Sequence, residues 1–321
     1  MAALSDPHAD SIVELRRVSE EHMLPLLEEE VASWSAELDW DFRPSADLVR
    51  RFVRMQALGG FAVMRGARAA GYAYYVCEEG KGLIGDLYVR KAHRRVETEN
   101  ALLESVLDAM WQTPGVRRVE AQIMMLASPL DRAVPHESWF QPYPRLFLEA
   151  PLASVATFPA RKLTRAAISP WSEARQEETA RLITAAYQGH VDSQINDQYR
   201  SASGARRFLM NIVQYPGCGA FFGPASYAAT DLQSGYLCGV SLASLVAADV
   251  GHITQVCVAP SHKGTGLGYE LMRRSLLALA AHQCRMVSLT VTAANETAVR
   301  LYERMGFVNR RKFAAYVWEP R

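Results

Sequence analysis

HKGTGLGYELMRRS, residues 262–275, places three glycines at alternate positions directly before a stretch whose apolar residues recur with helical spacing. Glycine is costly in regular structure, but it tolerates left-handed backbone conformations and lets a ligand approach the main chain closely. The preceding HITQVCV, residues 252–258, predicts a strand. A strand, a glycine turn and a helix N-terminus form an anion site, because backbone N–H groups and the helix dipole point into one concavity. An isolated turn of this kind is equally well explained as a flexible connection before a helix.

The spacing of the glycines excludes two common phosphate-binding motifs. A dinucleotide fingerprint has the form G-x-G-x-x-G, with an acidic residue about 20 positions later at the end of the next strand. Here the third glycine comes one position early, and the next strand ends in LTVTAAN. A nucleoside-triphosphate loop ends in G-K-S/T, which this turn lacks.

A second motif, NETAVRLYERMGF at residues 295–307, predicts an amphipathic helix that stops at Gly306. Together with V-C-V-A-P-x-x-K-x-x-G-x-G, it resembles the GNAT superfamily of acyl-CoA-dependent N-acyltransferases, specifically over residues 236–318 and more loosely over 161–235. The resemblance implies an α/β fold with a central, mostly antiparallel twisted sheet flanked by helices. It also implies transfer of an acetyl group from acetyl-CoA, without a metal, to a primary amine of a small molecule or peptide by direct attack in a ternary complex. A coenzyme A-binding regulatory or interaction module without turnover is the alternative.

The resemblance assigns the pyrophosphate of coenzyme A to backbone amides of the glycine turn, and the acyl carbonyl and pantetheine arm to the end of the preceding strand. Lys263 stands where the family has Arg or Gln; it retains the positive charge but lacks the bidentate fork. The implied cofactor-binding residues are Val256, Cys257, Val258, Lys263, Gly264, Thr265, Gly266, Leu267, Gly268 and Asn295.

Two side chains are candidates for proton transfer. The resemblance places Tyr302 beside the thioester sulfur as the acid, although its spacing from Ala298 also suits a half-buried aromatic residue. His252 is the candidate base, because histidine titrates near neutrality and the matching strand in the family carries a histidine or glutamate base. Strand alternation predicts His252, Thr254 and Val256 on one face. A histidine satisfied by hydrogen bonds within the sheet is the alternative.

The acceptor pocket of the family commonly lies between its first two helices, which corresponds to AYQGHVDSQINDQYR, residues 186–200. The candidate acceptor-binding residues there are His190, Asp192, Asn196 and Tyr199. A carboxylate such as Asp192 suits an ammonium group, whereas a solvated loop with helix-capping Asp and Asn is the alternative. His190 and Asp192 have no evident third ligand, so we expect no metal site.

The first half of the chain carries a counterpart of the glycine turn in HRRVETENALLES, residues 93–105. It aligns without a gap at an offset of 169 residues, so that Glu97 and Glu99 stand where Gly266 and Gly268 stand. Carboxylates and their bulk would oppose a pyrophosphate there. We therefore predict two tandem GNAT-like domains from a duplication: a degenerate, non-catalytic copy at 1–150, a linker (PLASVATFPA) at 151–160, and a catalytic domain at 161–321.

Composition excludes several other classes of protein. The 321 residues include 35 basic and 34 acidic side chains, a net charge of +1 that gives no indication of nucleic-acid binding. The start, MAALSDPHAD, lacks the pattern of a signal peptide, and no apolar stretch is long enough to span a bilayer. The five cysteines are scattered, as expected for reduced thiols. We expect a cytoplasmic protein without a membrane partner, either a monomer or a homodimer.

Overall fold

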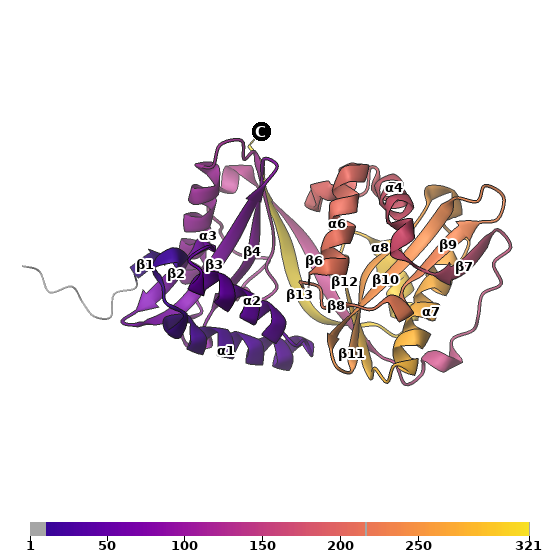
Figure 1. Ribbon diagram of the computed structural model, residues 1–321, viewed down its shortest axis with the longest axis horizontal. Helices are drawn as coiled ribbons and strands as arrows, with labels where there is room; N and C mark the ends of the chain where they lie inside the picture. The colour runs from indigo at the N-terminus through magenta and orange to yellow at the C-terminus, as the bar shows by residue number, and fades with distance from the viewer. Residues whose placement is uncertain (1–10, 216, 321) are drawn as a thin grey trace, which may run out of the picture. The chain divides into compact units, whose positions relative to one another are not determined.

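The computed structural model describes residues 11–215 and 217–320, which form two compact units. Unit 1 comprises the chain up to Pro144 together with the C-terminal segment from Lys312, and unit 2 is Arg145–Arg311. Each unit is a mixed sheet with helices on its faces, as the sequence predicts (Figure 1). The ten amino-terminal residues, on which the signal-peptide expectation rests, lie outside the described residues.

Unit 1 contains a six-stranded run in the order β1-β2-β3-β4-β5-β13, in which only β4 and β5 are parallel. Its strands are β1 (Ser11–Glu14), β2 (Gly59–Arg65), β3 (Arg68–Glu78), β4 (Lys81–Val89), β5 (Arg118–Gln122) and the end of β13 (Val308–Trp318). Its helices are α1 (Glu20–Leu38), α2 (Arg43–Arg54) and α3 (Val96–Trp111). Strand alternation sends Ala73 into the core beneath α3 and the neighbouring Tyr72 toward α1, where its hydroxyl donates to Glu30.

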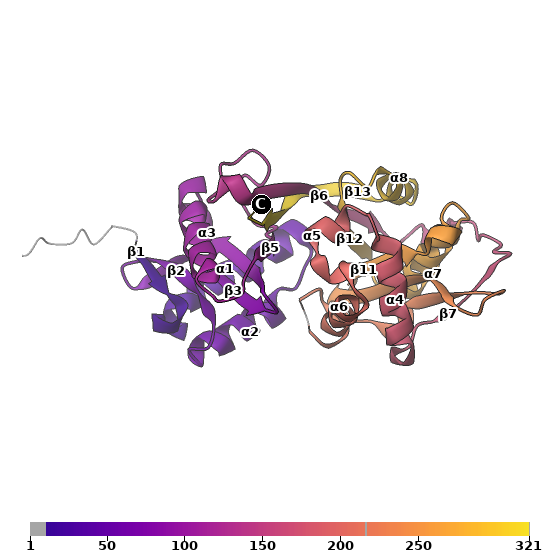
Figure 2. The same cartoon turned by 90° about the horizontal axis from the view of Figure 1, so that it is seen from above.

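Unit 2 has the strand order β6-β12-β11-β10-β9-β7, with the short β8 also paired to β10. Figure 2 shows β12 between β6 and β11. The strands are β6 (Phe140–Pro151, in this unit from Arg145), β7 (Ala166–Pro170), β8 (Ala220–Phe221), β9 (Tyr227–Asp231), β10 (Leu237–Ala247), β11 (Val250–Val258) and β12 (Met286–Thr292). The helices are α4 (Gln176–Tyr187), α5 (Asp192–Ile195), α6 (Ala202–Gln214), α7 (Leu267–Ala281) and α8 (Glu296–Arg304).

Helices cover both faces of the unit 2 sheet. Leu276 and Leu279 of α7 share a buried cluster with Leu289 of β12. On the other face, Leu182 of α4 and Leu209 of α6 pack in a cluster with strand β10 (Figure 1). The parallel pair β11–β12 is joined through α7, just as the parallel pair β4–β5 is joined through α3. This matched order supports the predicted duplication.

The borders of the units differ from those that the sequence suggested. The predicted catalytic domain ran to residue 321, but Ala315–Trp318 pair with β5, and Tyr316 and Trp318 lie in the core of unit 1. The aromatic side chains of this last strand are buried there, and the Trp318 indole donates to the Pro135 carbonyl at 2.9 Å. Within the predicted linker, Val155 is 3% exposed and belongs to the core of unit 2. Burial of apolar residues therefore places the change of unit at Pro144–Arg145.

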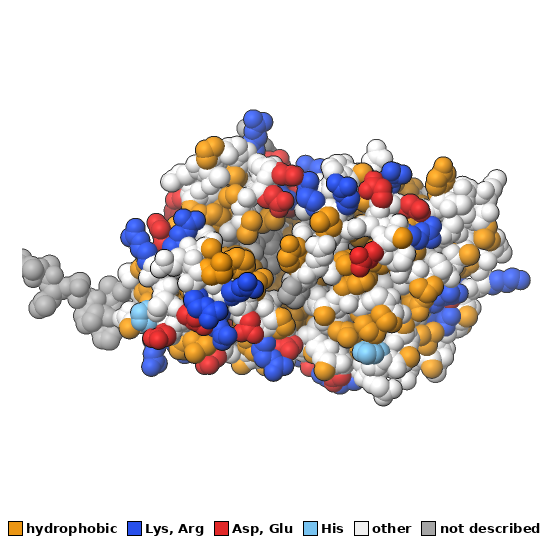
Figure 3. All heavy atoms as spheres, in the orientation of Figure 1, with side chains coloured by type: hydrophobic (Ala, Val, Ile, Leu, Met, Phe, Trp, Pro, Cys, Tyr) orange, Lys and Arg blue, Asp and Glu red, His pale blue; other side chains and the backbone are white. Residues whose placement is uncertain are grey.

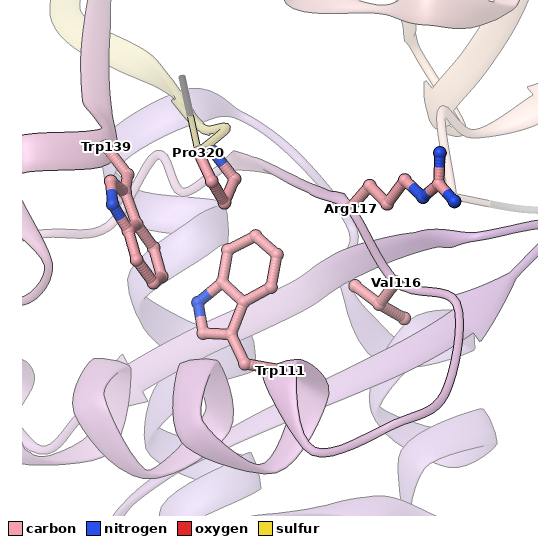
Figure 4. A pocket seen from close by; sticks show the side chains of 5 residues that line it. All are labelled: Trp111, Val116, Arg117, Trp139 and Pro320. Carbon is pink, nitrogen blue, oxygen red and sulfur yellow. The ribbon is translucent and has the colours of Figure 1, made fainter.

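A small aromatic pocket of about 370 Å³ lies within unit 1. Trp111 from the end of α3 and Trp139 form two of its walls, with ring centroids 5.4 Å apart and planes at 85°, and Pro320 lies beside them (Figure 4). The Arg117 side chain points away from the two indole rings.

Candidate active site

The glycine turn has the backbone geometry that its sequence predicts. Gly264 and Gly266 adopt φ angles of 79° and 84°, in the left-handed region that favours glycine. Gly266 is the N-cap of α7 and accepts the Glu270 N–H, and no side chain caps this helix end. The first-turn amides of α7 therefore have no intrahelical partner and are available to an anion.

Gly268 plays a different part from the other two glycines. It lies inside α7, where a Cβ would meet Val258 Cγ2 at 3.6 Å and Leu301 Cδ2 at 4.0 Å, which is ordinary packing distance. A Cβ on Gly264 would have no atom within 4 Å. The open side of the turn is therefore at Gly264 and Gly266, whereas Gly268 faces neighbouring apolar side chains.

His262 fixes the turn from the inside. Its ring is buried, and Nε2 lies 2.8 Å from Asp231 Oδ2. The backbone N–H and hydroxyl of Ser234 lower the pKa of Asp231 to about 2, with a further contribution from His262. Thr265 donates its hydroxyl to the His262 carbonyl at 2.7 Å. Lys263, the predicted cation of the motif, is exposed beside this anchored segment.

Arg161 is a second cation at the turn, and the sequence analysis did not find it. A Cβ built on Gly266 lies 4.0 Å from Arg161 Cγ, and the guanidinium lies over the Tyr269 ring at 5.7 Å. The Arg161 backbone N–H donates to Glu270 Oε2 at 3.0 Å. Burial alone would raise the pKa of Glu270, but bonds from Arg273, Arg161 and Arg274 outweigh it and lower the pKa to about 2. The only sequence signal was a basic pair after the expected linker, in a stretch interpreted as a strand.

The strands beside the turn separate where the resemblance expects an acyl group. β11 and β12 pair in parallel only from Val250 with Met286 to Ile253 with Leu289. On the other side of β11, the register with β10 shifts between Gln255 and Ile253, so Thr254 forms a β-bulge.

The bulge overturns the predicted alternation of side chains on β11. His252, Thr254 and Val256 were expected on one face, but Val256 packs beside the α7 core together with Ile253. Cys257 belongs to the cluster beneath α4 and α6, and Gln255 bonds to Tyr187 of α4. One extra residue reverses the direction of every later side chain.

His252 lacks the properties expected of a base. It is 4% exposed, its Nδ1 lies 2.9 Å from Ser288 Oγ, and its ring stacks on Phe147 at 6.3 Å. Burial lowers the pKa of His252 to about 3. The imidazole is therefore neutral at pH 7 and holds protons weakly, in agreement with the alternative of a histidine satisfied within the sheet.

Tyr302, the predicted acid, has a buried hydroxyl. It lies on α8, is 6% exposed, and contacts Phe307 within the core of unit 2. Burial and then the charge of Asp192 raise the pKa of Tyr302, so its hydroxyl keeps its proton at neutral pH. Asn295, predicted to bind cofactor, caps α8: its side-chain oxygen accepts the Ala298 N–H at 3.3 Å.

Of the four acceptor candidates, His190, Asp192 and Tyr199 lie close together, whereas Asn196 caps a turn. The Asp192 carboxylate accepts a hydrogen bond from the Thr292 hydroxyl and lies 3.6 Å from Arg145 Nη1. The Asp192 N–H donates to His190 Nδ1 at 3.2 Å. Asn196 instead accepts the Gln198 N–H at 3.1 Å and caps a 3₁₀ turn, as the alternative had it.

Tyrosines line the other side of this group. Tyr199 stacks on Tyr187 with ring centroids 4.4 Å apart, and Gln255 Nε2 donates to the Tyr187 hydroxyl at 3.0 Å. Burial raises the pKa of Tyr187, and the neighbouring Tyr199 and Asp192 raise it further. The sequence analysis missed Arg145, Tyr187 and Thr292 as members of the site, because they come from separate elements.

The counterpart of the turn in unit 1 carries a buried ion pair. Glu99 is fully buried, with one carboxylate oxygen 2.6 Å from Arg132 Nη1 and the other accepting the Ala127 N–H at 2.9 Å. Glu97 is exposed in the first turn of α3. A carboxylate with its own cation thus occupies the position that matches Gly268.

The described residues contain neither a metal-ligand group nor a membrane-spanning helix. None of their His, Cys, Asp and Glu side chains form a group of three or more suited to a metal ion. No helix within residues 11–215 and 217–320 combines the length and apolar character needed to cross a membrane. Basic and acidic side chains are interspersed on the face seen in Figure 3.

Comparison with known proteins finds similar sequences among acetyltransferases. Residues 193–307 match the model of the acetyltransferase (GNAT) family. The chain is 30% identical over 66 residues to the N-alpha-acetyltransferase MAK3 of Arabidopsis thaliana, covering 21% of this chain and 35% of that protein. It is 43% identical over 58 residues to the mycothiol acetyltransferase of Thermobispora bispora, covering 18% of this chain and 20% of that protein. The matches thus span about a third or less of these relatives.

Solved structures extend the likeness to both units. A tandem GNAT protein from the clavulanic acid biosynthesis pathway has a TM-score of 0.65 at 15% identity, covering 98% of this chain and all of that one. A GCN5-related N-acetyltransferase from Sphaerobacter thermophilus also has a TM-score of 0.65, at 18% identity, covering 99% of this chain and 97% of that one. At these identities the likeness is one of fold: the protein has the fold of tandem GNAT proteins, and residues 193–307, which lie in its second unit, match the acetyltransferase (GNAT) family model.

Proposed function

We propose that unit 2 transfers an acetyl group from acetyl-CoA to a primary amine by direct attack in a ternary complex. One observation carries the proposal. The uncapped glycine turn of α7 lies in the same unit as Tyr302, whose hydroxyl is buried and protonated and whose pKa is raised by burial and by the charge of Asp192. An anion site and a proton donor for a thiolate are the two devices that acyl transfer from a coenzyme A thioester requires.

The residues of the turn fit the diphosphate of coenzyme A. We assign its oxygens to the free amides of Leu267 and Gly268, reached past the open side of Gly264 and Gly266. Lys263 and Arg161 then supply positive charge from two sides, and the Arg161 fork supplies the bidentate geometry that Lys263 lacks. The separated end of β11, Val256 to Val258, is assigned to the pantetheine arm. When bound, the coenzyme supplies an acyl group already activated as a thioester.

On the acceptor side, we assign Asp192 to the ammonium form of the substrate. An amine with a pKa of about 10.4 needs roughly 4.6 kcal/mol to lose its proton to water at pH 7. Transfer to His252, with a pKa of about 3, would cost roughly 10 kcal/mol instead. We therefore give His252 no proton-transfer role, and we assign the proton to solvent while Asp192 and Tyr187 orient the amine.

Tyr302 completes the reaction by donating its hydroxyl proton to the sulfur as the C–S bond breaks, and the proton that the nitrogen loses after attack returns through solvent to the tyrosinate. Its raised pKa keeps the hydroxyl protonated across the neutral range but also makes it a weaker acid, so we propose that the proton moves only as the negative charge develops on the sulfur. In unit 1 the buried Glu99–Arg132 pair opposes an equivalent site, so we propose that only unit 2 binds the coenzyme.

The test is thiol release from acetyl-CoA with a panel of primary amines, for the wild type and Tyr302→Phe. We expect release that depends on the amine, and a fall in kcat of roughly 100-fold in the variant with unchanged binding of coenzyme A. The alternative function, a coenzyme A-binding module, predicts binding without release and no effect of Tyr302→Phe on any measured property except stability.

A further inference from the structure

A cavity of about 490 Å³ lies where the C-terminal end of α4, α5 and the start of α6 meet in unit 2. This volume is in the range of small-molecule sites. The lining residues that matter for its chemistry are Arg181, Tyr187, Gly189, Ser193, Tyr199 and Arg200. None of them has a role in the coenzyme site described above.

The cavity shares a wall with the proposed amine site. Its two tyrosines form the stacked pair that is bonded to Gln255 of β11. Asp192 lies in the chain between Gly189 and Ser193, two of the lining residues. Burial raises the pKa of Tyr187 and of Tyr199, and the charge of Asp192 raises both further. A molecule that binds Asp192 through its ammonium group can therefore place its other end in the cavity.

The cavity is positively charged. Among its described lining residues are two arginines and no Asp or Glu. The Arg200 Nε donates to the Ser193 carbonyl at 2.7 Å, which holds the guanidinium against α5. Arg181 pairs with Glu177 at 3.4 Å, with side chains 69% and 52% exposed, and such exposed pairs are weak.

We propose that this cavity receives the anionic end of the acceptor. The substrate is then a small primary amine that also carries a carboxylate or phosphate group: Asp192 binds the ammonium, the tyrosine pair contacts the body of the molecule, and Arg200 with Arg181 binds the anion. Guanidinium groups suit both anions because their N–H groups form paired bonds with two oxygens. This inference rests on the proposed function and narrows its acceptor.

The kinetic test uses matched acceptors that differ in the anion alone: O-phosphoethanolamine against ethanolamine, and β-alanine against its amide. For the wild type we expect kcat/KM at least roughly tenfold higher for the anionic member of each pair. Arg200→Gln should raise KM for the anionic amines by roughly 10- to 30-fold, leave kcat within about threefold, and leave the neutral amines unaffected. Arg206→Gln, an exposed arginine of α6 outside the cavity lining, is the matched control and should change neither.

A binding test separates failure of this inference from failure of the proposed function. Calorimetry of O-phosphoethanolamine with the full chain at saturating coenzyme A needs no turnover. Binding that is lost in Arg200→Gln and kept in Arg206→Gln supports the cavity even if no acceptor is acetylated. Equal kinetics within each acceptor pair, binding insensitive to Arg200→Gln, or a clear preference for a peptide N-terminus that ignores this substitution would each overturn the inference.

Discussion

Gly266→Glu is the substitution that most directly tests the placement of the coenzyme, because it copies the Glu97 of the degenerate unit into the working turn. Gly266 has a φ of 84°, so any side chain there costs about 1–2 kcal/mol in backbone strain. A carboxylate at a helix N-terminus recovers about 0.3–1 kcal/mol from the dipole. With the nearest atom to a new Cβ at 4.0 Å, no severe clash is added. The unit should therefore stay folded, with a net loss of about 1 kcal/mol.

The effect on coenzyme A should be much larger. Two like unit charges about 4 Å apart repel by roughly 4 kcal/mol at an effective dielectric of about 20. Rotation of the glutamate away from the turn relieves part of this repulsion. We expect the dissociation constant for coenzyme A to rise at least roughly 100-fold, which corresponds to about 2.7 kcal/mol.

The assay is calorimetric titration with coenzyme A, beside thermal unfolding of each variant. Gly268→Ala is the matched control, because the new Cβ meets Val258 at 3.6 Å in ordinary contact, and its affinity should stay within about threefold of the wild type. Lys263→Glu places a similar charge at an exposed neighbouring position without left-handed strain and should also weaken binding strongly. Wild-type affinity in both charge variants would refute the placement of the diphosphate at this turn.

Three further outcomes follow from the contacts of single residues. Arg161→Ala should raise the dissociation constant for coenzyme A by roughly 3- to 10-fold at low salt and less at high salt, with Arg161→Lys intermediate; titrations that show no change would remove Arg161 from the site. His252→Asn should leave kcat within about threefold. Because a His252 pKa of about 3 leaves the ring neutral throughout, kcat/KM should rise roughly tenfold per pH unit below the pKa of the amine. A plateau in kcat/KM with an apparent pKa of about 6.5 would instead indicate a histidine base. Glu99→Gln should destabilise unit 1 by about 3–5 kcal/mol, because it leaves Arg132 buried without its carboxylate. The melting temperature of unit 1 should fall by roughly 10 °C, and coenzyme A binding should not change. An unchanged melting temperature would show that the ion pair contributes little to stability.

The sequence alone predicted the features that depend on a residue and its near neighbours. Gly264, Gly266 and Gly268 predicted a turn whose backbone a ligand can approach closely, and the structure has positive φ at the first two. The helical periodicity of residues 295–307 located α8 and Tyr302, with Asn295 and Gly306 marking its ends. The offset of 169 residues between the two halves predicted the duplicated fold.

Tertiary structure decided everything that depends on burial or on residues distant in the chain. The bulge at Thr254 arises from pairing with β10, and it reversed the faces that simple alternation assigned along β11. Enclosure by β6 and β12, which no local pattern reveals, gives His252 its low pKa. Arg145 reaches Asp192 across 47 positions of sequence, and Arg161 reaches α7 across more than 100. Adjacent residues determine the local conformation of the backbone. The solvation and electrostatic environment of a site depend instead on the residues that folding brings into contact with it.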